Sequence, residues 1–182
     1  MPLFFVTGNA GKFEEVRSFV AGVEQWDVDL PEIQEMDARA IIAEKLAEAR
    51  RHREGTFIVE DTSLYLSCLR GLPGPLIKWF LQCLGDEGLS DLAARLGDDR
   101  AEARIYFGLA SPAGGVAYYE GAVAGRIVKP RGTRGFGWDR LFQPDGSDLT
   151  FGEMDADAKQ AFSMRRKALD ALLAAHPGLS RS

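Results

Sequence analysis

The sequence predicts an α/β domain built on a mixed β-sheet, and three features point to this fold class. The apolar run Leu3–Val6 precedes a glycine-containing turn and the start of a helix. An amphipathic helical stripe over Ala38–Arg53 leads into a second apolar strand at Thr56–Val59. Two further β-type segments, at 101–111 and 116–128, flank a turn rich in Pro and Gly. Strand–helix alternation implies parallel pairing early in the chain, and the later hairpin adds antiparallel strands.

The remaining elements follow from glycine and proline positions. The apolar stretch from Leu64 to Leu84 is interrupted at Gly71–Pro75 and closed by Gly85. The other expected elements are a helix from Lys12, a buried helix over 76–84, a short amphipathic helix over 89–96, the hairpin turn at 112–115, a loop over 129–137 and a helix over 155–175 that Pro177 and Gly178 stop. The chain shows no repeat and no linker, so we expect a single domain over 1–182.

Composition narrows the classes of function. The chain has 182 residues, 46% of them apolar, which suffices for a sizeable core, and a formal net charge of -5. An acidic chain is a poor partner for duplex nucleic acid, but a local basic pocket for a small polyanion remains allowed. Two histidines, and two cysteines without a CxxC pattern, nearly exclude a structural zinc site and indicate reduced thiols in a cytoplasmic protein. No apolar run reaches the roughly 20 residues that span a bilayer, and the apolar start is too short for a signal peptide.

Thr7–Lys12 joins a strand to a helix start, where free backbone N–H groups and the positive end of the helix dipole favour phosphate. The spacing is not that of a Walker A loop, because only two residues separate Gly8 from Gly11 and Phe13 follows the lysine. A tight strand–helix turn with a surface lysine explains the same residues equally well.

Acidic residues follow the second strand. Glu60 and Asp61 come directly after Thr56–Val59, and open α/β sheets bind ligands at the carboxyl ends of their strands. Neighbouring strand residues point to opposite faces, so only one of the two acids can face a given pocket unless the chain bends. If Asp61 converges with Glu32, their hard oxygens suit Mg²⁺, which takes one or two carboxylates together with substrate phosphates. Otherwise Glu60 and Asp61 lie at a strand end that is exposed to solvent.

Two lysines stand among apolar residues. Lys45 lies on the apolar stripe of its helix, and Lys78 stands between Ile77 and Trp79. Such a lysine either snorkels to solvent or meets an anion. One alone favours snorkelling, whereas two, together with Lys12 and a basic Gly-rich loop, favour an anionic ligand.

The segment Gly135–Asp139 combines flexible backbone with two aromatic rings and an acid. Its rings can stack on a planar base while the carboxylate accepts hydrogen bonds from ring N–H groups. The alternative is a loop whose aromatic rings fill the core. In the last helix three residues recur at helical spacing, which by itself is typical of a solvated face: Lys159, Ser163 and Arg165.

Seven ordered blocks run from the first strand to the last helix. They are Thr7–Lys12, Leu30–Glu32, Glu60–Leu64, Gly71–Pro75 with Ile77–Phe80, Pro130–Gly132, Gly135–Asp139 and Thr150–Met154. Together they resemble the inosine triphosphate pyrophosphatases, enzymes that hydrolyse non-canonical purine nucleoside triphosphates. The resemblance covers nearly the whole chain, and the ordered set is far more specific than any one block.

The resemblance implies a fold, a partner and a reaction. The fold is a two-lobed α/β domain with a long mixed sheet flanked by helices and a nucleotide cleft between the lobes, usually as a homodimer. The reaction is Mg²⁺-dependent hydrolysis of ITP, dITP or XTP to the monophosphate and pyrophosphate, which cleanses the cytoplasmic nucleotide pool. The implied partner is the purine nucleoside triphosphate, without nucleic acid or membrane.

By matched position, the resemblance also implies the site residues. The catalytic pair is Asp61, which accepts a proton from the attacking water, and Lys12, and the metal ligands are Glu32 and Asp61. The residues implied for the triphosphate are Thr7, Gly8, Asn9, Ala10, Gly11, Lys12, Lys45, Thr62 and Lys78. Those implied for the base and sugar are Phe136, Gly137, Trp138, Asp139, Lys159, Met164 and Arg165.

One position departs from the family pattern, since the usual Ser-His-Arg is Ser163-Met164-Arg165 here. Methionine has no N–H, so any hydrogen bond that the histidine makes to the base must come from Arg165, a backbone group or water. A pyrophosphatase for modified or pyrimidine nucleoside triphosphates is therefore one alternative. A nucleotide-binding module without turnover is another, and the acids at 32 and 61 speak against it.

Overall fold

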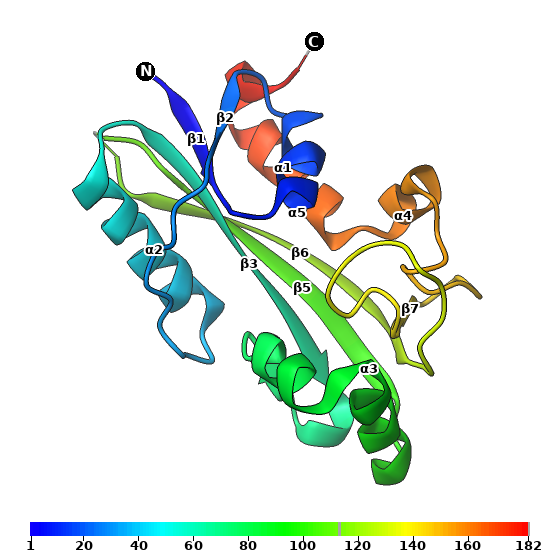
Figure 1. Cartoon of the computed structure of the whole chain (residues 1–182). Helices are drawn as coiled ribbons and strands as arrows, with labels where there is room; N and C mark the ends of the chain where they lie inside the picture. The colour runs from blue at the N-terminus through cyan, green and yellow to red at the C-terminus, as the bar shows by residue number, and fades with distance from the viewer. Residues whose placement is uncertain (113, 182) are drawn as a thin grey trace. The chain divides into compact units, whose positions relative to one another are not determined.

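The computed structural model describes residues 1–112 and 114–181, and within them it contains a mixed, seven-stranded sheet. Figure 1 shows the course of the chain through its helices and strands. The strand order of the sheet is β2-β1-β3-β5-β6-β7, with β4 paired to β3 off this path. The strands are β1 (Leu3–Val6), β2 (Val23–Trp26), β3 (Thr56–Leu66), β4 (Pro73–Gly74), β5 (Arg100–Ala110), β6 (Val116–Ile127) and β7 (Phe142–Pro144). β1 runs parallel to β2 and β3, whereas β4 is antiparallel to β3 and β7 to β6. The predicted α/β class is confirmed.

Helices alternate with the strands as far as β5, as the sequence predicts, whereas β2, β4 and β7 were not predicted. They are α1 (Ala10–Arg17), α2 (Ala38–His52), α3 (Ile77–Leu96), α4 (Ala156–Phe162) and α5 (Met164–Ala175), with short 3-10 turns at Ser67–Leu69 and Pro177–Leu179. Asn9, Asp37 and Asp155 cap α1, α2 and α4, each accepting a hydrogen bond from a backbone N–H of the first turn. Among the described residues, no helix has both the length and the apolar character needed to cross a membrane.

The largest differences from the predicted boundaries lie in α3, at Ser163 and at the end of β3, and α1 begins at Ala10, two residues before the predicted start. The two helices expected at 76–84 and 89–96 form α3, which is broken at Gly85 (φ 67, ψ -179). The single helix expected over 155–175 is divided by Ser163, whose backbone is extended. β3 continues to Leu66, well past the predicted end of its strand. The hairpin turn predicted at 112–115 includes Ala113, which lies outside the described residues, as does Ser182 of the predicted domain.

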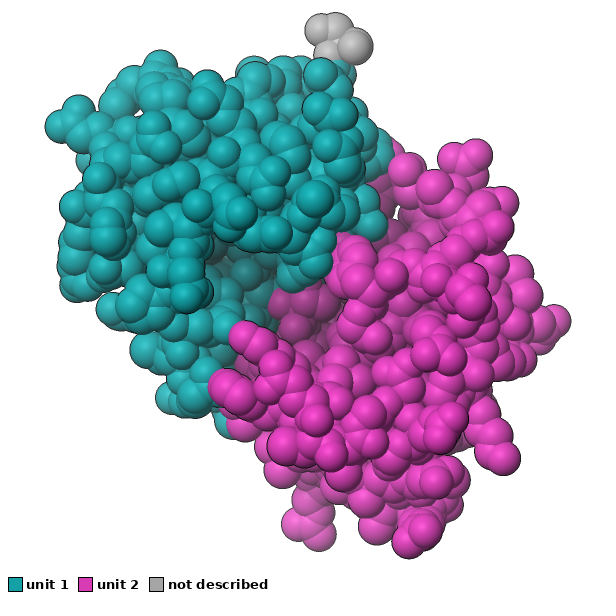
Figure 2. All heavy atoms as spheres, in the orientation of Figure 1, with its two compact units in different colours: residues 1–61, 105–121, 167–182 teal, residues 62–104, 122–166 magenta. Residues whose placement is uncertain are grey.

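The chain divides into two compact units, coloured separately in Figure 2. Unit 1 comprises residues 1–61, 105–121 and 167–182, and unit 2 comprises 62–104 and 122–166. The strands β3, β5 and β6 each contribute residues to both units.

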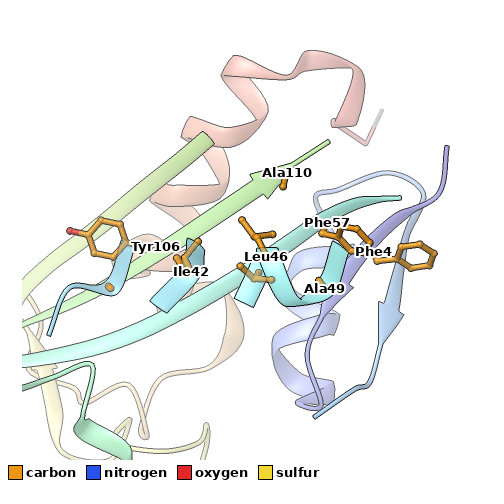
Figure 3. Packing of buried hydrophobic residues seen from close by; sticks show 9 residues of the cluster. Phe4, Ile42, Leu46, Ala49, Phe57, Tyr106 and Ala110 are labelled. Carbon is orange, nitrogen blue, oxygen red and sulfur yellow. The ribbon is translucent and has the colours of Figure 1, made fainter. Parts of the chain in front are cut away.

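In unit 1, α2 packs on the sheet through a cluster of buried side chains, shown in Figure 3. Ile42 and Leu46 of α2 belong to it together with Phe4 of β1 and Phe57 of β3. Phe5, whose side chain alternates to the opposite face, contacts the ring of Phe107 with centroids 6.2 Å apart. β1 is therefore buried on both faces, as expected of a parallel strand inside a sheet.

In unit 2, an aromatic cluster is built around β7. Trp138, Phe142 and Phe151 contact one another with ring centroids 5.2 to 6.3 Å apart, and all three are buried. The first half of α3 is less buried than the sequence predicts. Trp79 and Leu84 are exposed there and only Ile77 is buried, so the expectation of a buried helix over 76–84 was wrong.

Candidate functional site

A polar pocket of about 200 Å³ lies in unit 1, where the carboxyl end of β1 and the middle of β3 meet the start of α1. Its lining consists of Val6, Thr7, Gly8, Lys12, Val28, Asp29, Leu30, Glu32, Lys45, Val59 and Glu60. The pocket thus unites the predicted residues Thr7, Gly8, Lys12, Glu32 and Lys45, which are spread over nearly forty positions of sequence.

The register of two parallel strands explains this meeting. Phe5 of β1 pairs with Ile58 of β3, and two residues further on both strands are Thr7 and Glu60. β1 ends at Val6 and α1 begins at Ala10, so the intervening turn lies at the carboxyl edge of the sheet. That edge is where open α/β sheets bind their ligands.

The turn before α1 is stabilised by its own side chains. The Asn9 N–H donates to Thr7 Oγ1 at 3.1 Å, and the Asn9 side chain accepts from the Lys12 N–H at 3.0 Å. Because a helix leaves its first amides without partners inside the helix, Ala10 and Gly11 present donors at this end. The positive end of the helix dipole adds to their attraction for an anion.

Both lysines of the pocket are paired with glutamates. Lys12 Nζ lies 2.6 Å from Glu60 Oε1, and Lys45 Nζ forms an ion pair with Glu32. Lys45 Nζ also donates to the backbone oxygen of Glu60 at 3.4 Å. The Glu60 side chain is only 3% exposed and that of Lys45 17%, so these charges lie at the floor of the pocket. The alternative of a lysine that snorkels into solvent therefore does not describe Lys45.

Glu60 is the pocket residue that the sequence analysis left without a role. Alternation along a strand allows only one of two adjacent acids to face a given pocket, and the structure gives that place to Glu60. Asp61 is the next residue of β3; its side chain is buried and lies outside the lining of this pocket. The ion pair with Lys12 distinguishes Glu60 from Asp61. The spacing of residues along the sequence could not have predicted this ion pair.

The carboxylates of this region are suitable ligands for a hard cation, but they are too few to fill its coordination shell. Across residues 1–112 and 114–181, the structure gathers no three His, Cys, Asp or Glu side chains that could hold a metal ion by themselves. Glu32 lines the pocket and Asp61 does not, so their predicted convergence stays a prediction; both offer oxygen ligands only. This donor set suits Mg²⁺, which takes one or two carboxylates and fills its remaining positions with water and phosphate oxygens.

A second group of predicted residues meets in unit 2, around Phe136. The Asp139 Oδ2 atom accepts from the Phe136 N–H at 2.9 Å and from Lys159 Nζ at 2.8 Å. Lys159 Nζ lies 5.2 Å from the centroid of the Phe136 ring, and Arg165 Cζ lies 5.7 Å from it. Gly135 (φ +79) makes room for this carboxylate, because a Cβ there would lie 2.0 Å from Asp139 Oδ2.

The structure decides between the alternatives for these residues. Trp138 is buried in the aromatic cluster, so its ring fills the core, whereas Phe136 is half-buried between two cations. Arg165 is 3% exposed and Ser163 is buried, so the reading of a solvated helix face was wrong. Met164 is buried at the start of α5, and the exposed Gly137 lies in the turn before Trp138.

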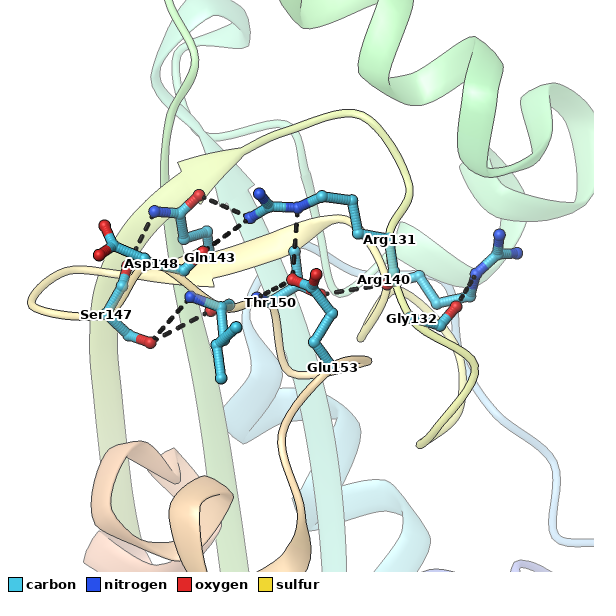
Figure 4. A network of polar contacts seen from close by, with 9 residues as sticks. Arg131, Gly132, Arg140, Gln143, Ser147, Asp148, Thr150 and Glu153 are labelled. Atoms are coloured by element: carbon cyan, nitrogen blue, oxygen red, sulfur yellow. Dashed lines mark hydrogen bonds and ion pairs between the residues drawn. The ribbon is translucent and has the colours of Figure 1, made fainter.

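Two sequence blocks near this group have a scaffolding role, shown in Figure 4. Arg131 donates to Gln143 Oε1 at 3.0 Å and to the Asp148 backbone oxygen at 3.1 Å, and its Nε lies 3.3 Å from Glu153 Oε2. The Thr150 N–H donates to the same carboxylate at 2.8 Å, and this backbone bond is the main cause of a lowered Glu153 pKa. Pro130–Gly132 and Thr150–Met154 therefore hold the loop around Phe136 in shape.

Besides Asp61, two predicted residues lie away from the turn before α1, the pocket lining and the group around Phe136. Thr62 is half-buried on β3. Lys78 is exposed on α3, with its Nζ 5.7 Å from the centroid of the Trp79 ring. Both belong to unit 2, and their assignment to the triphosphate stays a prediction.

Comparison with known proteins identifies relatives over nearly the whole chain. The family model of the Ham1 family matches residues 3–175. The Ham1 protein of Staphylococcus aureus is 24% identical, with a TM-score of 0.78 over 97% of this chain and 98% of that one. A nucleoside-triphosphatase / dITP/XTP pyrophosphatase from Mycobacterium abscessus is 27% identical, with a TM-score of 0.73 over 95% and 99%. A HAM1 protein from Coxiella burnetii is 20% identical, with a TM-score of 0.76 over 98% and 100%.

Proposed function

Because the chain belongs to the Ham1 family, we propose that it hydrolyses non-canonical purine nucleoside triphosphates such as ITP, dITP and XTP to the monophosphate and pyrophosphate. The likeness to the dITP/XTP pyrophosphatase from Mycobacterium abscessus supports this substrate class. The observation that carries the proposal is the unit 1 pocket, where two lysines and a helix N-terminus surround a space lined by carboxylates.

The pocket residues suit the triphosphate by charge and position. Lys12 and Lys45 would contact phosphate oxygens, and the amides of Ala10 and Gly11 would donate to them. Phosphoanhydride hydrolysis depends mainly on positioning and on stabilising charge, which these groups provide. A triphosphate in contact with both lysines meets two positive charges at one end of the sheet.

Asp61 would orient the attacking water and accept its proton. Its side chain is buried on β3, and Asp61 directly follows Glu60, which lines the pocket. Glu32 and Asp61 would hold Mg²⁺, whose role when bound is to neutralise phosphate charge. A carboxylate within reach of a water molecule is a common general base.

Selection of the base would rest on the group around Phe136. Lys159 and Arg165 carry only hydrogen-bond donors, and both approach the Phe136 ring. A donor beside the purine 6-position satisfies the oxo group of hypoxanthine or xanthine. It meets another donor in the amino group of adenine, which leaves buried polar atoms unpaired.

We propose further that the enzyme is a cytoplasmic homodimer. Both cysteines are free thiols, which fits a reducing compartment. Trp79 and Leu84 on α3 are exposed apolar side chains, the kind that an interface between copies buries. Light scattering of the purified chain should give twice the mass of 20.0 kDa, and a monomer at working concentration would refute the dimer.

Substrate preference tests the proposed function. Purified protein is assayed for pyrophosphate release with ITP, dITP, XTP, dUTP, GTP and ATP, each with Mg²⁺ and with EDTA. We expect release from the 6-oxo non-canonical purines at least about tenfold faster than from ATP, and none in EDTA. A preference for dUTP would favour a pyrimidine nucleotide pyrophosphatase, and no release from any of them a binding module.

A further inference from the structure

Lys12, which the proposed function assigns to the phosphate chain, is already ion-paired with Glu60. The Glu60 carboxylate is almost fully buried, and a buried charge is costly unless it is paired. Its partner Lys12 is more accessible, with 23% of its side chain exposed, and it lines the pocket. The Lys12 ammonium group thus contacts the buried Glu60 carboxylate and also faces the pocket that a ligand would enter.

We propose that Glu60 is the resident counter-ion of Lys12, which a phosphate chain must displace, so that the Glu60 carboxylate lowers the affinity of the pocket for anions. The inference rests on the proposed function only in naming a phosphate chain as the ligand. On binding, Lys12 exchanges the Glu60 carboxylate for a phosphate group. Lys12 therefore contributes to the free energy of binding only the difference between its interaction with phosphate and its interaction with Glu60. Glu60 is a positioning residue in this scheme, because it acts on the ligand through Lys12.

The second lysine has different partners. Lys45 contacts the backbone oxygen of Glu60 and the side chain of Glu32. Substitution of the Glu60 side chain leaves both of these partners in place. Glu60→Gln therefore removes the counter-ion of one lysine and keeps the shape of the side chain.

The test is the affinity of the pocket for inorganic tripolyphosphate, measured by titration calorimetry in EDTA at constant ionic strength. We expect Glu60→Gln to bind tripolyphosphate about tenfold more tightly than the wild-type chain, within the usual range of couplings between neighbouring sites. Lys12→Met in the Glu60→Gln background should abolish this gain, because the gain acts through the Lys12 ammonium.

Asp29→Asn is the matched control for charge. Asp29 lines the same pocket but is exposed, so water screens its carboxylate. Removing this charge should change the affinity less than about twofold. An equal gain in Asp29→Asn and Glu60→Gln would show a general effect of charge and overturn the proposal, as would equal affinities of Glu60→Gln and the wild-type chain, or no binding by either.

Two further measurements keep the outcome interpretable. Near-UV circular dichroism checks that Glu60→Gln is folded. If it is not, Glu60→Asp, which retracts the carboxylate from Lys12, is used instead and should show a smaller gain in affinity for tripolyphosphate. No gain in this variant would overturn the proposal. Hydrolysis of ITP is measured separately on the wild-type chain. If Glu60→Gln binds tripolyphosphate more tightly but the wild-type chain hydrolyses no ITP, the proposed function is refuted and the proposed role of Glu60 stands. If the wild-type chain hydrolyses ITP but Glu60→Gln shows no tighter binding, the proposed role of Glu60 is refuted and the proposed function stands.

Discussion

At the scale of single residues, burial and pairing decide which charged side chains form the pocket. Lys45 could be placed from sequence because it stands on the apolar stripe of its helix, and the structure shows it at the pocket floor. Glu60 could not be chosen over Asp61, since adjacent strand residues differ only in the face they occupy and spacing does not say which face holds the lysine. Trp138 and Phe136 were equally ambiguous, because glycine-flanked aromatics suit both a core and a stacking surface.

Asp61→Asn tests the proposed general base. The substitution keeps the size of the side chain and removes its charge, so kcat for ITP should fall by about 10²- to 10⁴-fold with a smaller change in KM. The same change at Asp157, an exposed residue in the first turn of α4, serves as the control and should leave kcat unaltered. Near-wild-type turnover of Asp61→Asn would remove this residue from the reaction.

Asp98 gives a prediction about acid stability. Its carboxylate accepts from Arg100 Nε at 2.9 Å and Arg100 Nη2 at 2.7 Å, which lowers the Asp98 pKa from 3.8 to about 2. A lowered pKa in the folded state means that the pair stabilises the fold above pH 3.8 and that this stabilisation is lost as the pH falls towards about 2.

Urea unfolding between about pH 5 and about pH 2.5 measures this effect. The free energy of unfolding of Asp98→Asn should fall less steeply with acidification than that of the wild-type chain, because the variant has no carboxylate to protonate there. Parallel curves for the two proteins would show that the pair with Arg100 contributes nothing to folding.

At the scale of elements, segments with a clear apolar pattern could be predicted, and short strands without one could not. The apolar run of β1 and the stripe of α2 are periodic enough to specify their type and nearly their ends. β2 has no buried residue, with its two central residues exposed, and β4 and β7 have two and three residues, so their pairing depends on neighbours that only the fold supplies. The break at Ser163 was missed because serine carries no strong stop signal.

Gly108 of β5 tests how α2 is seated on the sheet. A Cβ at this position would lie 2.2 Å from Ile42 Cγ2 and 2.9 Å from Leu46 Cδ1, both on α2. Gly108→Ala should therefore overpack the unit 1 core and lower the free energy of unfolding by about 1–3 kcal/mol. Gly178→Ala, where a Cβ would meet nothing within 4 Å, is the control and should stay within about 0.5 kcal/mol. Equal stabilities of the two variants would mean that α2 can move away from β5 without loss.

At the scale of the whole molecule, the net charge of -5 gives little indication of the site. The negative total excludes an extended basic face, yet it coexists with a pocket in which two lysines face a ligand-sized space and with two cations beside Phe136. The class of fold could be predicted from strand–helix alternation and was confirmed. The substrate class came from ordered motifs, because net charge and periodicity do not specify which anion a pocket binds.

The identity of the products tests the central claim most directly. ITP is incubated with the wild-type chain and Mg²⁺, and the products are resolved by ³¹P NMR. Hydrolysis between the α- and β-phosphates predicts inosine monophosphate and pyrophosphate in equal amounts. Inosine diphosphate with orthophosphate, or intact ITP after prolonged incubation, would contradict it.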